Sequence, residues 1–148
     1  MSALTVHIDG GTAALAGKIT EDADFAPVLS LVQAGPVRLD LRGVTQISST
    51  GVREWILLMR ALDGADVTLV AVAPTLVRQL NMIAGFAGPA AIASVLLPYY
   101  CDACGAEENV ELSVDGDRAI PSSRPCAACG EDAEFDDMPK SYLKFLDG

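Results

Sequence analysis

Four cysteines are the residues in this sequence whose type and spacing most clearly indicate chemistry. They occur as two CxxCG units, with 21 residues between the last cysteine of the first unit and the first cysteine of the second. In each unit the two sulfurs can converge on one ion, and the following glycine frees the backbone where the turn is tight. Four thiolates match the tetrahedral coordination that Zn²⁺ prefers. The pattern therefore predicts a metal site formed by Cys101, Cys104, Cys126 and Cys129.

Protein ligands would fill all four positions of such a site, which leaves no place for a catalytic water. We therefore expect a structural zinc, one per chain. Residues 109–114 and the Asp115-Gly116 turn predict a hairpin between the two units, as in a zinc ribbon. A region this small needs the ion in order to fold.

Three other interpretations of the cysteines stay open. Disulfides are rare in the cytosol, where thiols are kept reduced. A rubredoxin-like iron site also uses paired CxxCG units. A thioredoxin-type redox pair needs a single CxxC unit beside a βαβ motif, whereas this sequence has two matched units.

The charge of the chain changes near Pro98. Residues 1–98 contain eight acidic and six basic side chains, whereas residues 99–148 contain twelve acidic and four basic ones. Most of the net charge of −10 therefore belongs to the second part. This break predicts two domains, residues 1–98 and residues 99–148. An acidic surface repels phosphates, so we expect no nucleic acid among the partners.

The N-terminus lacks the basic and apolar segments of a signal peptide, so we expect a cytoplasmic protein with no membrane partner. Residues 82–100 carry no charge over about the length of a bilayer span. However, two glycines and two prolines interrupt them. The segment therefore predicts the end of a helix, a turn and a buried strand.

Strand and helix patterns alternate through the first domain. Strands are predicted for residues 4–8, 13–19, 37–41, 66–73 and 91–97. Helices are predicted for residues 24–33, for residues 51–62 and for a segment that starts at Pro74. This order predicts an α/β fold, a mixed sheet with packed helices. After the small ribbon, Pro139 is expected to open a short C-terminal helix, which either packs back on a domain or docks a partner.

The stretch VRLDLRGVTQISSTGVR, residues 37–53, resembles the core of STAS domains, the fold of bacterial anti-sigma factor antagonists. In that family a strand with a pattern like LDLSGV leads to an acid-Ser-Ser/Thr-Gly turn, which opens the next helix. Residues 16–19 are similar to the family's early strand, and residues 66–87 are similar to its late strand-helix unit. The resemblance covers about residues 3–98 and implies a STAS-like mixed sheet.

The resemblance also implies a role for the turn. A partner kinase would phosphorylate the serine that follows the acid, which by position is Ser49, and a phosphatase would oppose it. The kinase or an anti-sigma-factor-like regulator would bind the surface of Ser48, Ser49, Thr50 and Gly51. In this sequence Ser48 stands where the family usually has an aspartate.

The residues of the turn have a structural interpretation as well. Ser49 or Thr50 is expected to cap the helix that begins at Gly51, because a hydroxyl can accept the orphan amide hydrogens of a helix start. A phosphate on Ser49 would lie at the positive end of the helix dipole, so the fold should tolerate it. It would add negative charge to a neutral surface and weaken a docked partner.

The sequence contains few residues that could form an enzyme active site. His7 is the only histidine and lies on the polar face of its strand, and the chain has no Gly-rich phosphate loop. We therefore expect no catalytic residue and a non-enzymatic signalling adaptor that binds a kinase or regulator. The alternative is a constitutive protein-protein scaffold with a structural zinc ribbon and no phosphorylation.

Overall fold

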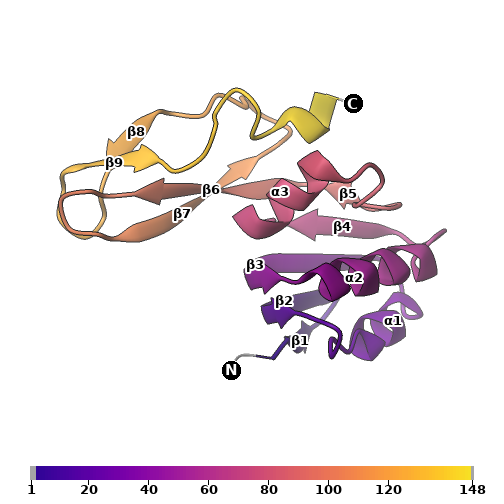
Figure 1. Cartoon of the computed structure of the whole chain (residues 1–148). Helices are drawn as coiled ribbons and strands as arrows, with labels where there is room; N and C mark the ends of the chain where they lie inside the picture. The colour runs from indigo at the N-terminus through magenta and orange to yellow at the C-terminus, as the bar shows by residue number, and fades with distance from the viewer. Residues whose placement is uncertain (1–2, 148) are drawn as a thin grey trace.

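The computed structural model describes residues 3–147, which form two β-sheets and three helices (Figure 1). The first sheet has the strand order β1-β2-β3-β4-β5, in which β1 runs antiparallel to β2 and the other neighbours are parallel. Its strands are β1 (Thr5–Asp9), β2 (Thr12–Ile19), β3 (Val37–Ile47), β4 (Val67–Val70) and β5 (Ala91–Ile92). This mixed sheet confirms the predicted α/β class.

The three helices lie on one side of the first sheet (Figure 1). They are α1 (Ala26–Val32), α2 (Ser49–Ala61) and α3 (Pro74–Met82). Alternation along β3 explains this one-sided arrangement, because Val37, Leu39 and Leu41 are buried whereas Arg38 and Arg42 are exposed. The apolar face of the sheet is thus covered by helices, and the charged face is not.

The core of this region is built around Trp55 on α2. Its side chain is fully buried, and its ring stacks on Phe86 at 5.6 Å between centroids. The indole N–H donates a hydrogen bond to the Phe86 carbonyl at 2.8 Å, so the one polar atom of the side chain is satisfied. Leu58 and Met59 are buried on the same face of α2 as Trp55.

The second sheet has the order β7-β6-β9-β8, with every neighbouring pair antiparallel. Its strands are β6 (Ser94–Tyr100), β7 (Glu107–Ser113), β8 (Ser123–Pro125) and β9 (Asp132–Phe135), and η1 (Lys144–Asp147) is a short 3-10 helix. The sequence predicted one last strand of the first sheet over residues 91–97. Instead β5 ends at Ile92 and β6 joins the second sheet, so the predicted domain boundary after residue 98 falls inside β6.

The two sheets are joined through β6. The Val72 N–H donates to the Ser94 carbonyl at 3.1 Å, and the Leu96 N–H donates to the Val72 carbonyl at 2.9 Å. Val72 lies two residues after the end of β4, so the end of the first sheet bonds to the start of the second. An apolar run carries no local signal of such a change of sheet, which is why the sequence pattern missed it.

The C-terminal segment packs back on both regions. Tyr142 is buried, and its hydroxyl donates to the Leu96 carbonyl of β6 at 2.6 Å. The Asn81 amide of α3 donates to the Tyr142 carbonyl at 2.9 Å. Of the two interpretations left open for this segment, packing on the protein itself is therefore the one realised.

Residues 82–100 form the end of α3, a loop, β5 and β6, so the predicted helix end and turn are present, whereas two strands replace the single strand that was predicted. Within residues 3–147, no helix has both the length and the apolar character that crossing a bilayer requires.

Candidate metal centre

Each CxxCG unit forms the tip of a hairpin. The first unit joins β6 to β7, and the second joins β8 to β9. The prediction that a hairpin turns at Asp115-Gly116 between the units is therefore wrong, because β7 pairs backward with β6. Both strands flanking each unit are hydrogen-bonded to each other, so each pair of cysteines is held by its own ladder.

The two tips have the same local backbone structure. In each one the first cysteine carbonyl accepts the N–H of the glycine four residues later, at 2.7 Å for Gly105 and 2.9 Å for Gly130. The first cysteine N–H also donates to a carbonyl five residues later, Ala106 or Glu131. Both glycines adopt positive φ, 77° and 80°, a conformation that other residues reach only with strain. The glycine in each unit is therefore required by the turn.

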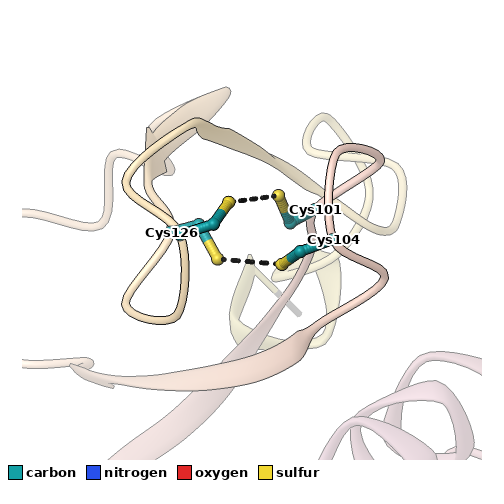
Figure 2. Close-up of side chains that lie close together, drawn as sticks. Cys101, Cys104 and Cys126 are labelled. Carbon is teal, nitrogen blue, oxygen red and sulfur yellow. Dashed lines mark hydrogen bonds between the residues drawn. The ribbon is translucent and has the colours of Figure 1, made fainter.

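The two tips bring all four sulfurs together (Figure 2). The Sγ atoms lie within 4.8 Å of one another, and the shortest separations are 3.5 Å for Cys101–Cys129 and 3.7 Å for Cys104–Cys126. A tetrahedral ion with Zn–S bonds of about 2.3 Å needs S–S separations of about 3.8 Å. The donor set and its spacing thus fit a tetrahedral metal ion.

The first cysteine of each pair is buried and the second is exposed. Cys101 and Cys126 are buried, whereas Cys104 and Cys129 lie at the surface. Each of the two shortest contacts joins a buried sulfur to an exposed one. An ion among these sulfurs would therefore lie between the two hairpins and connect them.

The four thiols do not ionise equally. The backbone N–H groups of Cys129 and Ala128 favour the thiolate of Cys126 and lower its pKa to about 7. The Glu131 N–H acts in the same sense on Cys129, but the neighbouring thiols, Cys101 first, outweigh it and raise the pKa of Cys129 to about 12. Four thiolates so close repel one another unless a cation compensates their charge, so metal binding would release protons.

The turn before α2 differs in one respect from the sequence prediction. Ser48, and not Ser49 or Thr50, is the N-cap of α2, and its Oγ accepts the Gly51 N–H at 3.0 Å. An aspartate at an N-cap accepts the same kind of bond. Ser48 therefore supplies the capping interaction that an acid at this position would supply.

Gly51 is required by a close approach of two chain segments. A Cβ atom at this position would collide with the carbonyl oxygen of Ile19 on β2. That carbonyl also accepts the Ser48 N–H at 3.0 Å, which fixes it against the turn. The Ser48-Ser49-Thr50-Gly51 turn is thus packed tightly against the end of β2.

Ser49 is exposed as the first residue of α2. The exposed residues Arg53 and Leu57 follow it at intervals of four, and Leu57 keeps 47% of its surface accessible. Neither residue was predicted as part of the site, although their spacing from Ser49 was a usable signal. Thr50 is also exposed, but its hydroxyl donates to the Glu21 carboxylate at 3.3 Å.

Comparison with known proteins adds no relative: no family model matches the chain, and no curated protein does.

Proposed function

We propose that the protein is a non-enzymatic signalling adaptor of the anti-sigma factor antagonist type, with a structural zinc ribbon. The observation that carries this proposal is the exposed position of Ser49 at the start of α2, in a turn whose sequence resembles that of the family. A kinase or other regulator would bind the surface of Ser48, Ser49, Thr50 and Gly51. Arg53 and Leu57 extend that surface along α2 and offer a cation and an apolar contact.

The surroundings of the turn favour Ser49 over Thr50 as the modified residue. A phosphate on Ser49 would lie beside the free N–H groups of the helix start and one turn from the Arg53 guanidinium. A phosphate on Thr50 would replace the donor that Glu21 accepts and would face that carboxylate instead. The phosphate would add nearly two negative charges to the binding surface and so weaken a partner docked there.

The ion proposed for the ribbon is zinc, one per chain, held by Cys101, Cys104, Cys126 and Cys129. All four ligand positions are then occupied by protein, so the zinc has a structural role. Protein purified after growth with both zinc and iron should be colourless and contain about one zinc per chain. A red protein that contains iron would instead support the rubredoxin-like alternative.

The second candidate is a constitutive scaffold without phosphorylation. The observation that favours it is Ser48, because a kinase that recognises the family's aspartate would not find that acid here. The exposed stripe of Ser49, Arg53 and Leu57 would then bind a partner permanently. The two candidates differ in one respect only, which is whether a charge on Ser49 controls binding.

The deciding experiment compares Ser49→Ala, Ser49→Asp and wild-type protein as baits in the native host. The recovered partners are quantified, and intact-mass analysis reports a phosphate on the wild-type bait. If the switch operates, Ser49→Ala retains the partner, Ser49→Asp loses it, and the phosphate is found on Ser49. Equal recovery by all three baits would establish the scaffold.

Stability measurements separate binding from folding in this experiment. The free energies of unfolding of Ser49→Ala and Ser49→Asp should lie within about 0.5 kcal/mol of the wild-type value, because Ser49 is exposed and does not cap the helix. Ser48→Ala is the matched control, since it removes the capping oxygen and should cost about 1 kcal/mol. If Ser48→Ala loses stability but retains the partner, the cap and the switch are separate functions of adjacent serines.

A further inference from the structure

The outer edge of β7 is an unpaired strand edge. β7 is the first strand in the order β7-β6-β9-β8, and within residues 3–147 its only strand partner is β6. The bonds from Cys101 N–H to the Ala106 carbonyl and from Val114 N–H to the Ala93 carbonyl show that even-numbered residues bond inward. The N–H and carbonyl groups of Glu107, Asn109, Glu111 and Ser113 therefore point outward. Among residues 3–147 no backbone group outside the strand bonds to them.

This edge lacks most of the features that usually protect a strand edge. Proteins protect such edges with very short strands, prolines, charged side chains or bulges. The charged side chains of β7 are three glutamates, which repel an acidic strand and not a basic one. β8, at the opposite edge of the same sheet, is three residues long and contains Pro125. β7 has seven residues, no proline and no basic residue, and its register with β6 is uninterrupted. The edge is thus regular and long enough to accept another strand.

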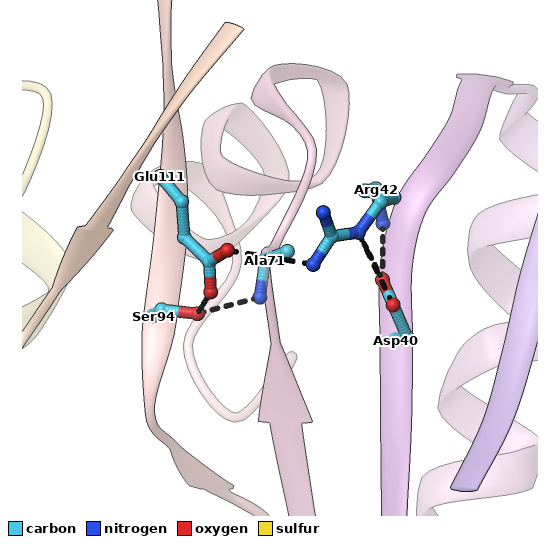
Figure 3. Close-up of polar contacts among 5 residues, drawn as sticks. All are labelled: Asp40, Arg42, Ala71, Ser94 and Glu111. Carbon is cyan, nitrogen blue, oxygen red and sulfur yellow. Dashed lines mark hydrogen bonds and ion pairs between the residues drawn. The ribbon is translucent and has the colours of Figure 1, made fainter.

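The Glu111 side chain also anchors β7 to the neighbouring strands (Figure 3). The Glu111 carboxylate accepts the Ser94 hydroxyl at 2.7 Å, and the Ala71 N–H donates to the Ser94 hydroxyl at 2.8 Å. Arg42 of β3 approaches the same carboxylate at 3.4 Å. An edge fixed in this way needs little ordering when a peptide binds.

The charge around the edge indicates what would bind. Glu107 is exposed at the start of β7, Asp115 is exposed just beyond its end, and the whole chain has a net charge of −10. A second copy would approach against repulsion, whereas a basic segment would be attracted. We propose that the β7 edge binds an extended peptide of a partner protein that carries Lys or Arg at alternate positions.

Side chains alternate between the two faces of β7, so each face should select a different kind of peptide side chain. Side chains of odd-numbered residues share one exposed face, on which Glu107 would lie beside a basic residue, whereas the Glu111 carboxylate already pairs with Arg42. Val110 and Leu112 share the other face and are half-buried. The intervening residues of the peptide should therefore be apolar. Backbone bonds would supply affinity, and the two rows of side chains would supply selection.

This edge is independent of Ser49, so the inference does not rest on the proposed switch. The probe is a synthetic capped peptide as long as β7, with alternating lysine and valine, added to the metal-loaded full chain. The control peptide has glutamate in place of every lysine. Calorimetric titration should show binding of the lysine peptide that weakens with added salt and no binding of the glutamate peptide.

A matched pair of substitutions tests whether the backbone edge itself binds. Asn109→Pro removes one outward N–H, and Asn109→Ala retains it while removing the same side chain. A proline whose missing N–H faces outward is tolerated on an edge strand. Asn109→Pro should weaken the peptide about tenfold or more, whereas Asn109→Ala should bind as wild type does. Metal content and the thermal midpoint identify a variant that fails to fold.

Glu107→Lys provides a second test that does not disturb the ladder, because Glu107 is exposed and forms no ion pair among the described residues. It should weaken the lysine peptide and strengthen the glutamate peptide. The inference is overturned if Asn109→Pro and Glu107→Lys both bind like wild type, or if the two peptides bind equally. Self-association of Asn109→Ala that Asn109→Pro abolishes would assign the edge to a second copy instead.

Discussion

Trp55 and the four cysteines are the centres of two regions that are stabilised in different ways. Around Trp55, three helices cover one face of a five-stranded sheet, and apolar side chains from every strand except the outermost β1 and β5 are fully buried. Around the cysteines, exposed and half-buried residues alternate along β7, whereas β6 is buried from Ser94 to Tyr99. Tyr99, Phe135 and Tyr142 pack edge to face. The first region has a core of its own. The second has this small aromatic cluster, the four-cysteine site and the contacts that it makes with the first.

The difference shows how a small β-region can be maintained without a large core. Small scaffolds below about 70–80 residues usually need a metal, a disulfide or a partner surface to be stable. The second sheet has two of these, the sulfur cluster at its tips and the contacts of β6 and Tyr142 near its base. Each region should therefore respond to a different perturbation.

The largest effect is expected from removing the metal site. Cys101→Ser replaces a buried thiol ligand, and structural zinc contributes about 10–16 kcal/mol to the folding of small zinc modules. The metal should be lost and the second sheet, β6 to β9, should unfold. Trp55 is the only tryptophan, so its fluorescence reports the first region alone. We expect the thermal transition of the first region to persist at a lower midpoint, because the hydrogen bonds between β6 and Val72 are then lost.

The outcome of that experiment also tests the separation of the two regions. Metal content, circular dichroism and Trp55 fluorescence should be followed on the same sample. A variant that shows no Trp55 transition would mean that the two sheets fold as one unit. An unchanged midpoint would mean that the contacts between β6 and Val72 contribute nothing.

The opposite perturbation is Gly51→Ala in the first region. A methyl group at this position meets the Ile19 carbonyl, which is fixed by its bond to Ser48. Overpacking of this kind costs about 1–3 kcal/mol. The free energy of unfolding, measured by Trp55 fluorescence in denaturant, should fall by that amount while metal content stays unchanged. A loss of metal in this variant would contradict the view that the ribbon depends mainly on its ion.

The smallest effect is expected at the contact between the regions. Tyr142→Phe removes the hydroxyl that donates to the Leu96 carbonyl and should cost about 1 kcal/mol at neutral pH, with the metal retained. Denaturant unfolding of both proteins provides the measurement. Equal stability would show that the hydroxyl contributes nothing beyond the packing of the ring.

The same hydroxyl gives this contact a pH dependence. Burial, followed by the charge of Asp137, raises the pKa of Tyr142 above its ordinary value of 10.0. The folded state then keeps its proton at a pH where the unfolded state loses it. Stability is therefore complete below about pH 10 and falls as the pH rises above it. Tyr142→Phe should lose less stability than wild type between neutral pH and pH of about 11.

Much of the fold could be predicted because its signals are local. The alternation in residues 37–41 and the helical spacing around Trp55 specify elements from neighbouring residues alone, and both elements are present. The extension of β3 to Ile47 could not be predicted. It follows from pairing with β2, which continues to Ile19 through two irregularities in register.

The prediction of the turn failed at one serine for a similar reason. Three hydroxyl residues in a row can each cap a helix, and the choice depends on where the chain enters. The bond from the Ser48 N–H to the Ile19 carbonyl fixes that entry, and Ile19 is distant in sequence. Tertiary contact therefore selected Ser48 as the cap and left Ser49 exposed.

The sequence by itself determined the four cysteine positions, the glycines that shape each tip and the order of strands and helices as far as α3, because all of these follow from spacing along the chain. Only the tertiary structure decided which sheet receives residues 94–100, which strand edge stays open and where the C-terminal segment lies. Arg42 and Glu111 meet across 69 residues of sequence, and Tyr142 reaches Leu96 across 46. Such contacts depend on the packing of whole elements, and no local pattern encodes them.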